Sequence, residues 1–187
     1  MLLACAGPHR KAVDARAGAR QIAPMETLIL MRHGKAVREH EAPTDRARAL
    51  TERGRADAAA VGAQLAKSGL TIDLALVSPA VRTQETFEAV QSTLGPTVSR
   101  TIERLYMADA EEIFETALAA GAQRVLVIGH NPGMHDLVRR LIAQAYDHSA
   151  VAQDLSAHFP TSAFAAFELS GDVLDAAGPR LLAAARP

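Results

Sequence analysis

Two arginines and two histidines are placed where they could together bind a phosphoryl group and react with it. Arg32 and His33 follow one apolar run of the 187-residue chain, Arg82 comes soon after a second run, and His130 follows a third. Planar guanidinium groups match the oxygens of a phosphate better than those of a carbonyl or a sugar. A neutral imidazole is a good nucleophile toward phosphorus, and a phosphoryl group on its nitrogen passes readily to water. These residue types therefore predict phosphoryl binding and transfer.

The neighbours of the two histidines indicate which of them reacts. His33 lies between Arg32 and Gly34 at the end of a predicted strand, and a glycine lets the backbone come close to a ligand. We therefore assign His33 as the nucleophile. Arg32 and Arg82 would clamp the phosphoryl oxygens, and His130 would bind a further oxygen. Such a site stabilises charge without a metal ion.

Three further residues could contact the phosphate at lower priority: Ser78, Asn131 and Lys35. Each also has a purely structural interpretation. A serine before a proline commonly begins a helix, and an asparagine can shape its own turn. A lysine can steer anions or simply lie on the surface.

The elements that must position these residues alternate along the chain. Continuous apolar runs at 27–31, 74–77 and 125–128 are typical of strands buried on both faces of a parallel sheet. The polar stretch 36–50 is interpreted as a loop over the edge of the sheet. The fold class predicted is therefore α/β, a single domain with a mostly parallel central sheet and helices on both faces. The other expected elements are helices over about 51–68, 79–94, 109–118 and 132–145, a weaker strand at 98–102 and an edge strand at 163–169.

The two ends of the chain are expected to lie outside this domain. Residues 1–24 are rich in arginine and lack apolar periodicity, so they are interpreted as a disordered extension. The domain would cover 25–170, and 171–187 would form a loosely attached tail. No apolar run approaches the length that spans a bilayer, and no secretory signal is recognisable, so a cytoplasmic location is expected.

Composition excludes several classes of protein. A net charge of −1 and an aromatic content of 4% argue against a protein that coats nucleic acid or an anionic membrane. The single cysteine, Cys5, cannot form a disulfide within the chain. None of the seven histidines has convincing metal-ligand spacing. We therefore expect no metal, no cofactor, and no nucleic-acid or membrane partner.

Four ordered motifs together resemble those of the histidine phosphatase superfamily, named after its Arg-His-Gly motif. They are residues 32–36, 48–54, 78–86 and 129–132. The short length and the segment 159–161 make the chain similar to the bacterial SixA-type phosphohistidine phosphatases. The resemblance covers about 26–170 and implies a phosphoglycerate mutase-like fold. It also implies a covalent phosphohistidine on His33, a pocket completed by Arg32, Arg82 and His130, and no metal requirement.

The sequence says less about two points: which residue donates a proton to the leaving group, and what the substrate is. Many members of this superfamily use a carboxylic acid after a middle strand, and Glu103 is in a plausible place for it, with Asp109 as a competitor that also fits a helix cap. A phosphorylated imidazole leaves more easily than an alkoxide, so cleavage of an N–P bond needs no strong acid. This favours phosphohistidine over sugar-phosphate esters. The resemblance, together with loops too short to form a deep lid over a small substrate, implies a phosphorelay protein such as a histidine phosphotransfer domain as the partner. A small-molecule phosphomonoesterase and a non-catalytic phosphate- or phosphoprotein-binding module remain alternatives. In each case a phosphate or sulfate ion should fit the site.

Overall fold

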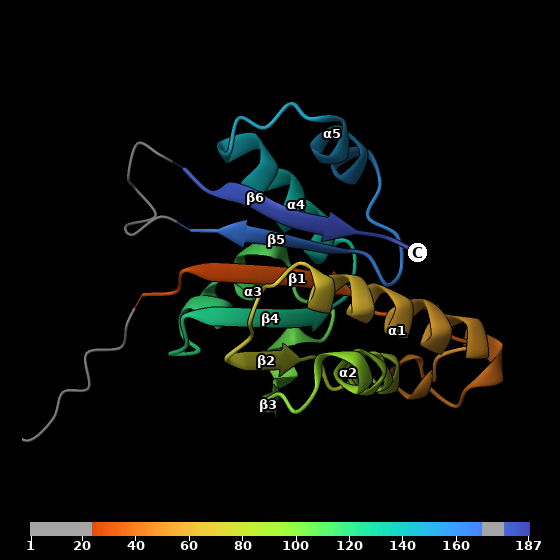
Figure 1. The fold of residues 1–187 in the computed structure, drawn as a ribbon. Coiled ribbons are helices and arrows are strands. Elements are labelled where there is room, and N and C mark those ends of the chain that lie inside the picture. The colour runs from red at the N-terminus through yellow and green to blue at the C-terminus, as the bar shows by residue number, and fades with distance from the viewer. Residues whose placement is uncertain (1–23, 170–177) are drawn as a thin grey trace, which may run out of the picture.

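The computed structural model describes residues 24–169 and 178–187 of the chain. Six strands form one sheet in the order β3-β2-β4-β1-β5-β6 (Figure 1). Strands β1, β2, β3 and β4 are mutually parallel, β5 is antiparallel to β1, and β6 is antiparallel to β5. The predicted α/β single domain with a mostly parallel sheet is therefore confirmed. The strands are β1 Thr27–Arg32, β2 Leu74–Val77, β3 Ser99–Thr101, β4 Arg124–Gly129, β5 Phe164–Glu168 and β6 Arg180–Ala185.

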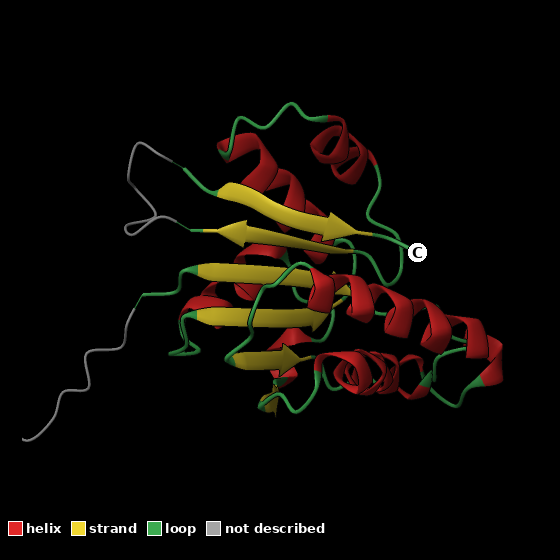
Figure 2. Ribbon diagram, in the orientation of Figure 1, coloured by secondary structure: helices red, strands yellow, loops and turns green. Residues whose placement is uncertain are grey.

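Helices cover both faces of the sheet (Figure 2). Successive residues of a strand point to opposite faces, and the central strand β1 follows this rule. Its Leu28 and Leu30 belong to one apolar cluster, whereas Ile29 and Met31 belong to another. The first cluster packs against α3, α4 and α5, and the second packs against α1 and α2. The helices are α1 Glu52–Lys67, α2 Val81–Leu94, α3 Ala110–Leu118, α4 Gly133–Gln144 and α5 Ala150–Ala157.

Side-chain caps begin two of the helices that the sequence predicts. The Thr51 hydroxyl accepts a hydrogen bond from the Gly54 amide at the start of α1. The Asp109 carboxylate accepts one from the Glu112 amide at the start of α3. Each bond satisfies an amide that has no partner inside its helix. Asp109, which the sequence analysis named as either a competing general acid or a helix cap, is a helix cap in the structure.

The structure differs from the sequence-based expectation in its last third. The strand expected at an edge, β5, lies inside the sheet between β1 and β6. Residues 180–185, expected to belong to a loose tail, form β6 against β5. The helix α5 was not predicted. Residues 1–23 and 170–177, which include most of the expected extension and part of the expected tail, lie outside the described residues.

The connection between β1 and α1 is more ordered than the loop expected there. It contains two short 3₁₀ turns, Glu39–Glu41 and Asp45–Ala47, and a bridge between Ala36 and Leu50 closes it. This connection contributes to the site described below.

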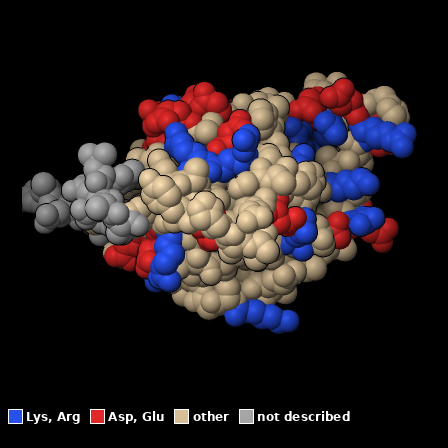
Figure 3. All heavy atoms as spheres, turned by 90° about the horizontal axis from the view of Figure 1, so that it is seen from above, with Lys and Arg blue, Asp and Glu red and all other residues tan. Residues whose placement is uncertain are grey.

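The surface carries charges of both signs. Figure 3, a view from above, shows Lys and Arg side chains interspersed with Asp and Glu around a largely uncharged area. This mixture agrees with the net charge of −1. Among the described residues, no helix is both long and apolar enough to cross a membrane.

Candidate active site

Three strand ends meet at the carboxyl edge of the sheet. In the register of β1 with β4, Arg32 lies opposite Gly129. The His33 amide donates to the Gly129 carbonyl at 3.1 Å, and the Ser78 amide donates to the Ile128 carbonyl at 3.1 Å. As a result the His33 and His130 rings lie with their centroids 5.1 Å apart. Parallel strands thus bring together residues that are about a hundred positions apart, as the crevice rule for such sheets predicts.

These residues line a hollow of about 500 Å³. It contains six of the eight residues that the sequence singled out, and it leaves out Ser78 and Glu103. The connection from β1 to α1 supplies another part of the wall. The lining residues are Arg32, His33, Lys35, Ala36, Glu39, Asp45, Arg48, Arg82, Met107, His130, Asn131 and Thr161.

The geometry of His33 leaves one ring nitrogen available as a nucleophile. Its Nδ1 lies 2.7 Å from the Gly34 carbonyl oxygen, which can only accept, so we place the proton on Nδ1 and the lone pair on Nε2. Burial lowers the pKa of His33 to about 4, and the positive charges of Arg82, Arg32 and Arg48 contribute to this, while the bond to Gly34 opposes it. The ring is therefore neutral at pH 7.

Close backbone packing holds the segment that carries His33. A Cβ added to Gly34 would lie 2.7 Å from the Gly54 carbonyl oxygen, and a Cβ added to Gly54 would lie 2.1 Å from the Lys35 carbonyl oxygen. The first turn of α1 can approach this loop only because both residues are glycines. The Gly34 amide also donates to the buried Thr86 hydroxyl of α2 at 2.9 Å.

His130 is held by protein groups at both ring nitrogens. Nη2 of Arg82 lies 3.2 Å from Nδ1 and can only donate, so Nε2 carries the proton and donates to the Ser78 hydroxyl at 2.7 Å. Burial lowers the pKa of His130 to about 3, with repulsion from His33 and Arg82 as further causes. Ser78 is fully buried behind this ring and orients it. A direct bond from His130 to a phosphoryl oxygen stays a prediction, because it requires one of these partners to be exchanged.

Arg82 has an anionic partner that the sequence analysis missed. Its Nη2 donates to Asp45 Oδ2 at 2.9 Å, and its Nη1 donates to the Asp45 main-chain oxygen at 2.6 Å. Asp45 also accepts from Arg48 and from the Tyr106 hydroxyl. The sequence analysis did not predict Asp45, Arg48 or Tyr106 as site residues. Asp45 and Arg48 lie in the polar stretch 36–50, which was interpreted as a loop, and Tyr106 lies close to Glu103, the residue chosen from that segment. Arg48 does open one of the recognised motifs, which was the available signal.

Arg32 and Asn131 also line the hollow, and they share one main-chain acceptor. Both donate to the main-chain oxygen of Phe159 at 3.0 Å, Arg32 through Nη1 and Asn131 through Nδ2. Arg32 Nε and Asn131 Oδ1 are buried without a hydrogen-bond partner in the structure.

Glu103, the possible general acid, lies outside the hollow. The Glu103 side chain is 72% exposed, is paired with Arg46 at 2.7 Å and does not line the hollow. The carboxylates among the lining residues are Glu39, which is exposed, and Asp45. Burial works to raise the pKa of Asp45, but hydrogen bonds from Tyr106, Arg48 and Arg82 outweigh it and hold the pKa well below its usual range. Asp45 is thus ionised and cannot deliver a proton.

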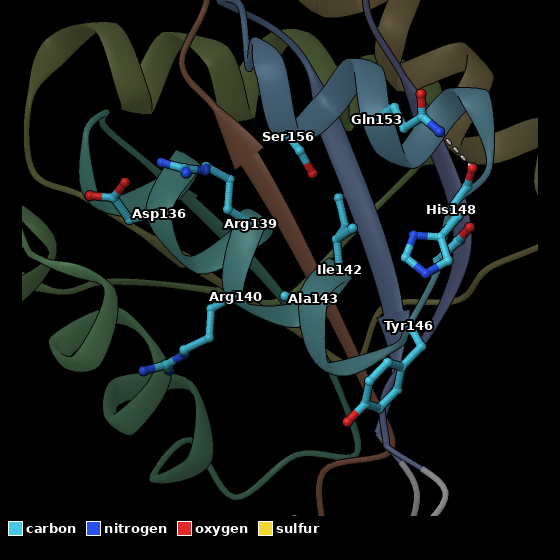
Figure 4. Close-up of a pocket in the computed structure, with 10 residues that line it drawn as sticks. Asp136, Arg139, Arg140, Ile142, Ala143, Tyr146, His148, Gln153 and Ser156 are labelled. Carbon is cyan, nitrogen blue, oxygen red and sulfur yellow. Dashed lines mark hydrogen bonds between the residues drawn. The ribbon is translucent and has the colours of Figure 1, made fainter.

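A second hollow, of about 610 Å³, lies between α4 and α5 (Figure 4). It contains none of the residues predicted for chemistry. Figure 4 shows Arg139 and Arg140 extending to one side of α4, with Tyr146 and His148 at the other end of the hollow. Arg140 is paired with Glu111 of α3. Among the described residues, no group of three or more metal-ligating side chains is gathered in either hollow or elsewhere.

Comparisons with known proteins agree with this geometry. The family model "Histidine phosphatase superfamily (branch 1)" matches residues 28–106. The solved structure of SixA from Nakamurella multipartitia is 30% identical, with a TM-score of 0.72 over 88% of this chain and 98% of that one. The chain belongs to the histidine phosphatase superfamily. It is accordingly a phosphatase, a class of hydrolase.

Two further structures of the superfamily are similar over nearly their whole lengths. SixA from Agrobacterium tumefaciens is 27% identical, with a TM-score of 0.73 over 87% of this chain and 99% of that one. A protein histidine phosphatase SixA in complex with tungstate is 25% identical, with a TM-score of 0.67 over 86% of this chain and 96% of that one. The family-model match ends at residue 106, before His130. The place of His130 in the candidate site therefore rests on its position in the fold.

Proposed function

We propose that this phosphatase hydrolyses phosphohistidine on a protein, through a covalent phosphoryl group on Nε2 of His33. The observation that carries the choice of substrate is the set of carboxylates in the hollow. Asp45 is ionised and bonded to Arg82, and Glu39 is exposed. An ester would need a proton for its alkoxide, whereas an imidazole leaves without a strong acid.

The first step would move the phosphoryl group from the substrate to His33. The lone pair on Nε2 of His33 attacks phosphorus, and the N–P bond of the substrate breaks. Its electron pair returns to the substrate ring, which carries a proton on its other nitrogen and so leaves as a neutral imidazole. Arg32 and Arg82 both line the hollow and would stabilise the charge on the phosphoryl oxygens. Because Gly34 keeps a proton on Nδ1 of His33, the phosphorylated ring is cationic.

The second step would return the enzyme to its starting state. Water attacks phosphorus, the N–P bond to His33 breaks, and the electron pair goes back to Nε2. The cationic ring leaves as a neutral imidazole, and the protons of the water stay with the released phosphate. The neutral state of His33 at pH 7 then makes it ready for the next cycle.

A protein substrate is supported by the exposed mouth of the hollow. Lys35 and Glu39 are exposed there, and the Met107 side chain is 51% exposed. A phosphorylated side chain projecting from a folded surface could therefore reach His33. The tungstate-bound relative, a protein histidine phosphatase, supports both an oxyanion in this hollow and this class of substrate. A histidine phosphotransfer domain and a cytoplasmic location stay predictions.

The test begins with the covalent intermediate. The enzyme is mixed with a histidine phosphotransfer domain carrying labelled phosphate, quenched without acid and digested, and the label is located by mass spectrometry. We expect it on His33, and we expect His33→Ala to abolish turnover. His148→Ala is the matched control, since this histidine lies outside the candidate site. Turnover in His33→Ala would contradict the assignment of the nucleophile.

The choice of substrate is tested separately by comparing the phosphorylated domain with a panel of phosphate esters. We expect the N–P substrate to be cleaved with the higher kcat/KM. Faster cleavage of an ester would identify a small-molecule phosphomonoesterase. Tungstate binding without hydrolysis of either class would identify a phosphate-binding module.

A further inference from the structure

Asp45 joins three side chains that come from separate parts of the chain. Its Oδ2 accepts from Arg82 Nη2 at 2.9 Å and from the Tyr106 hydroxyl at 2.7 Å, and its Oδ1 accepts from Arg48 Nη1 at 2.8 Å. Its main-chain oxygen accepts from Arg82 Nη1 at 2.6 Å. Charge-assisted bonds of this kind are short and directional. The carboxylate is therefore a shared acceptor for two guanidinium groups and a phenol.

These bonds fix the orientation of Arg82. The side chain is only 3% exposed, and both of its terminal nitrogens bond to Asp45, one of them also facing Nδ1 of His130 at 3.2 Å. A long side chain has many rotamers, and ordering it normally costs entropy at the moment of binding. Here groups of the protein itself hold that orientation.

The turn that carries Asp45 is itself held in place. Thr44 caps it by accepting from the Ala47 amide, and Nε of Arg48 donates to the Val37 carbonyl at 2.9 Å. Tyr106 in turn packs edge-on against the His130 ring, with centroids 5.6 Å apart. The contacts of Asp45 thus extend to both the arginine and the histidine side of the hollow.

We propose that Asp45 is a positioning residue, which holds Arg82, Arg48 and Tyr106 in the arrangement that receives the phosphoryl group. The inference rests on the proposed phosphatase site and adds a residue to it. Asp45 would act through Arg82 and Arg48, without contacting the reacting atoms.

Removing the charge of Asp45 distinguishes two possible roles of this residue: holding the arginines in position, or only reducing the positive charge of the hollow. If Asp45 only reduced the positive charge of the hollow, Asp45→Asn would bind anions more tightly, because one negative charge near the ligand is gone. If Asp45 positions the cations, the same variant binds anions more weakly in spite of that change. The two explanations predict opposite signs.

The experiment measures tungstate affinity by calorimetry and kcat on the phosphorylated domain, for the full chain. We expect Asp45→Asn to weaken tungstate binding about tenfold and to lower kcat by ten- to a hundredfold, the scale of loss when a positioned group is misplaced. Asp73→Asn is the matched control, because it also breaks an Asp–Arg pair, with Arg124. That pair lies at the amino ends of β2 and β4, whereas the candidate site lies at the carboxyl ends of the strands. This control should leave both quantities unchanged. Equal or tighter tungstate binding by Asp45→Asn would overturn the proposal.

Tyr106→Phe provides a second, milder variant that keeps the Asp45–Arg82 pair. It removes one bond to Oδ2, so we expect about a threefold loss of tungstate affinity, smaller than that of Asp45→Asn because both bonds from Arg82 to Asp45 remain. An unchanged affinity in a folded Tyr106→Phe protein would count against the proposal, even if Asp45→Asn failed to fold. Tungstate binding needs no turnover, so a wild-type enzyme inactive on phosphohistidine would refute the proposed substrate and leave this test intact.

Discussion

His33 should remain unprotonated at a pH where an ordinary histidine is charged. The experiment is a titration from pH 8 to 4.5, and the pKa of His33 gives the protonated fraction expected at each pH. With a pKa of about 4, about 3% of His33 is protonated at pH 5.5, whereas a histidine with a pKa of about 6.5 is about 91% protonated. The cause is burial first, and then repulsion from the arginines around the ring.

The assay is NMR of the histidine rings, with the His33 signal assigned from its loss in His33→Asn. A short histidine-containing peptide provides the reference titration. The His130 ring lies 5.1 Å away, so the midpoint observed belongs to both rings, and we expect it below pH 5. Saturating tungstate should move it upward, because a bound anion stabilises the imidazolium form. A midpoint near 6.5 without ligand would refute the reasoning.

The same shift predicts how stability responds to acid. The pKa of His33 is lower in the folded than in the unfolded chain, so the unfolded chain binds more protons between pH 6.5 and 4. The free energy of unfolding should therefore fall as the pH falls through this window, by up to about 3 kcal/mol for this one ring. Urea unfolding at pH 7 and 4.5 measures it. A His33→Asn protein as acid-sensitive as the wild type would contradict this assignment.

Two substitutions test other parts of the site. Arg82→Lys keeps the charge but cannot bond to the main-chain oxygen and Oδ2 of Asp45 and to His130 together, so kcat/KM should fall about a hundredfold; near-normal kinetics would exclude Arg82 from the pocket. Glu103→Gln should leave the hydrolysis of esters and of phosphohistidine unchanged, because Glu103 points to solvent beside Arg46; a selective loss with esters would restore it as the general acid.

The parts of the fold that could be predicted from the sequence are those whose residues are favourable only when buried. Runs such as 27–31 and 125–128 have no polar face, so they must be buried on both sides, and they form the two central strands. The residues that follow them had to meet at one edge. This is why the sequence alone predicts that His33 and His130 lie together.

What the sequence did not predict depends on contacts between distant segments. The run 180–185 is short and alanine-rich, and it becomes a strand only because β5 offers it an edge. Asp45 is a polar residue in a polar stretch, and nothing nearby in the sequence distinguishes it from a solvated side chain. Its role depends on Arg82, 37 positions away. Glu103 as general acid stays a prediction: it follows a strand as expected, but its side chain is 72% exposed and paired with Arg46.

The charge balance of the hollow connects these observations. Arg32, Arg48 and Arg82 gather their positive charges around His33, and such a cluster repels itself unless something offsets it. The structure offsets it in two ways: the two imidazoles are neutral at pH 7, and one ionised carboxylate, Asp45, is bonded to two of the three arginines. A phosphoryl dianion would provide the remaining negative charge. The site is therefore arranged to receive an anion, and the neutral imidazole that this arrangement requires is also the form of His33 that can attack phosphorus.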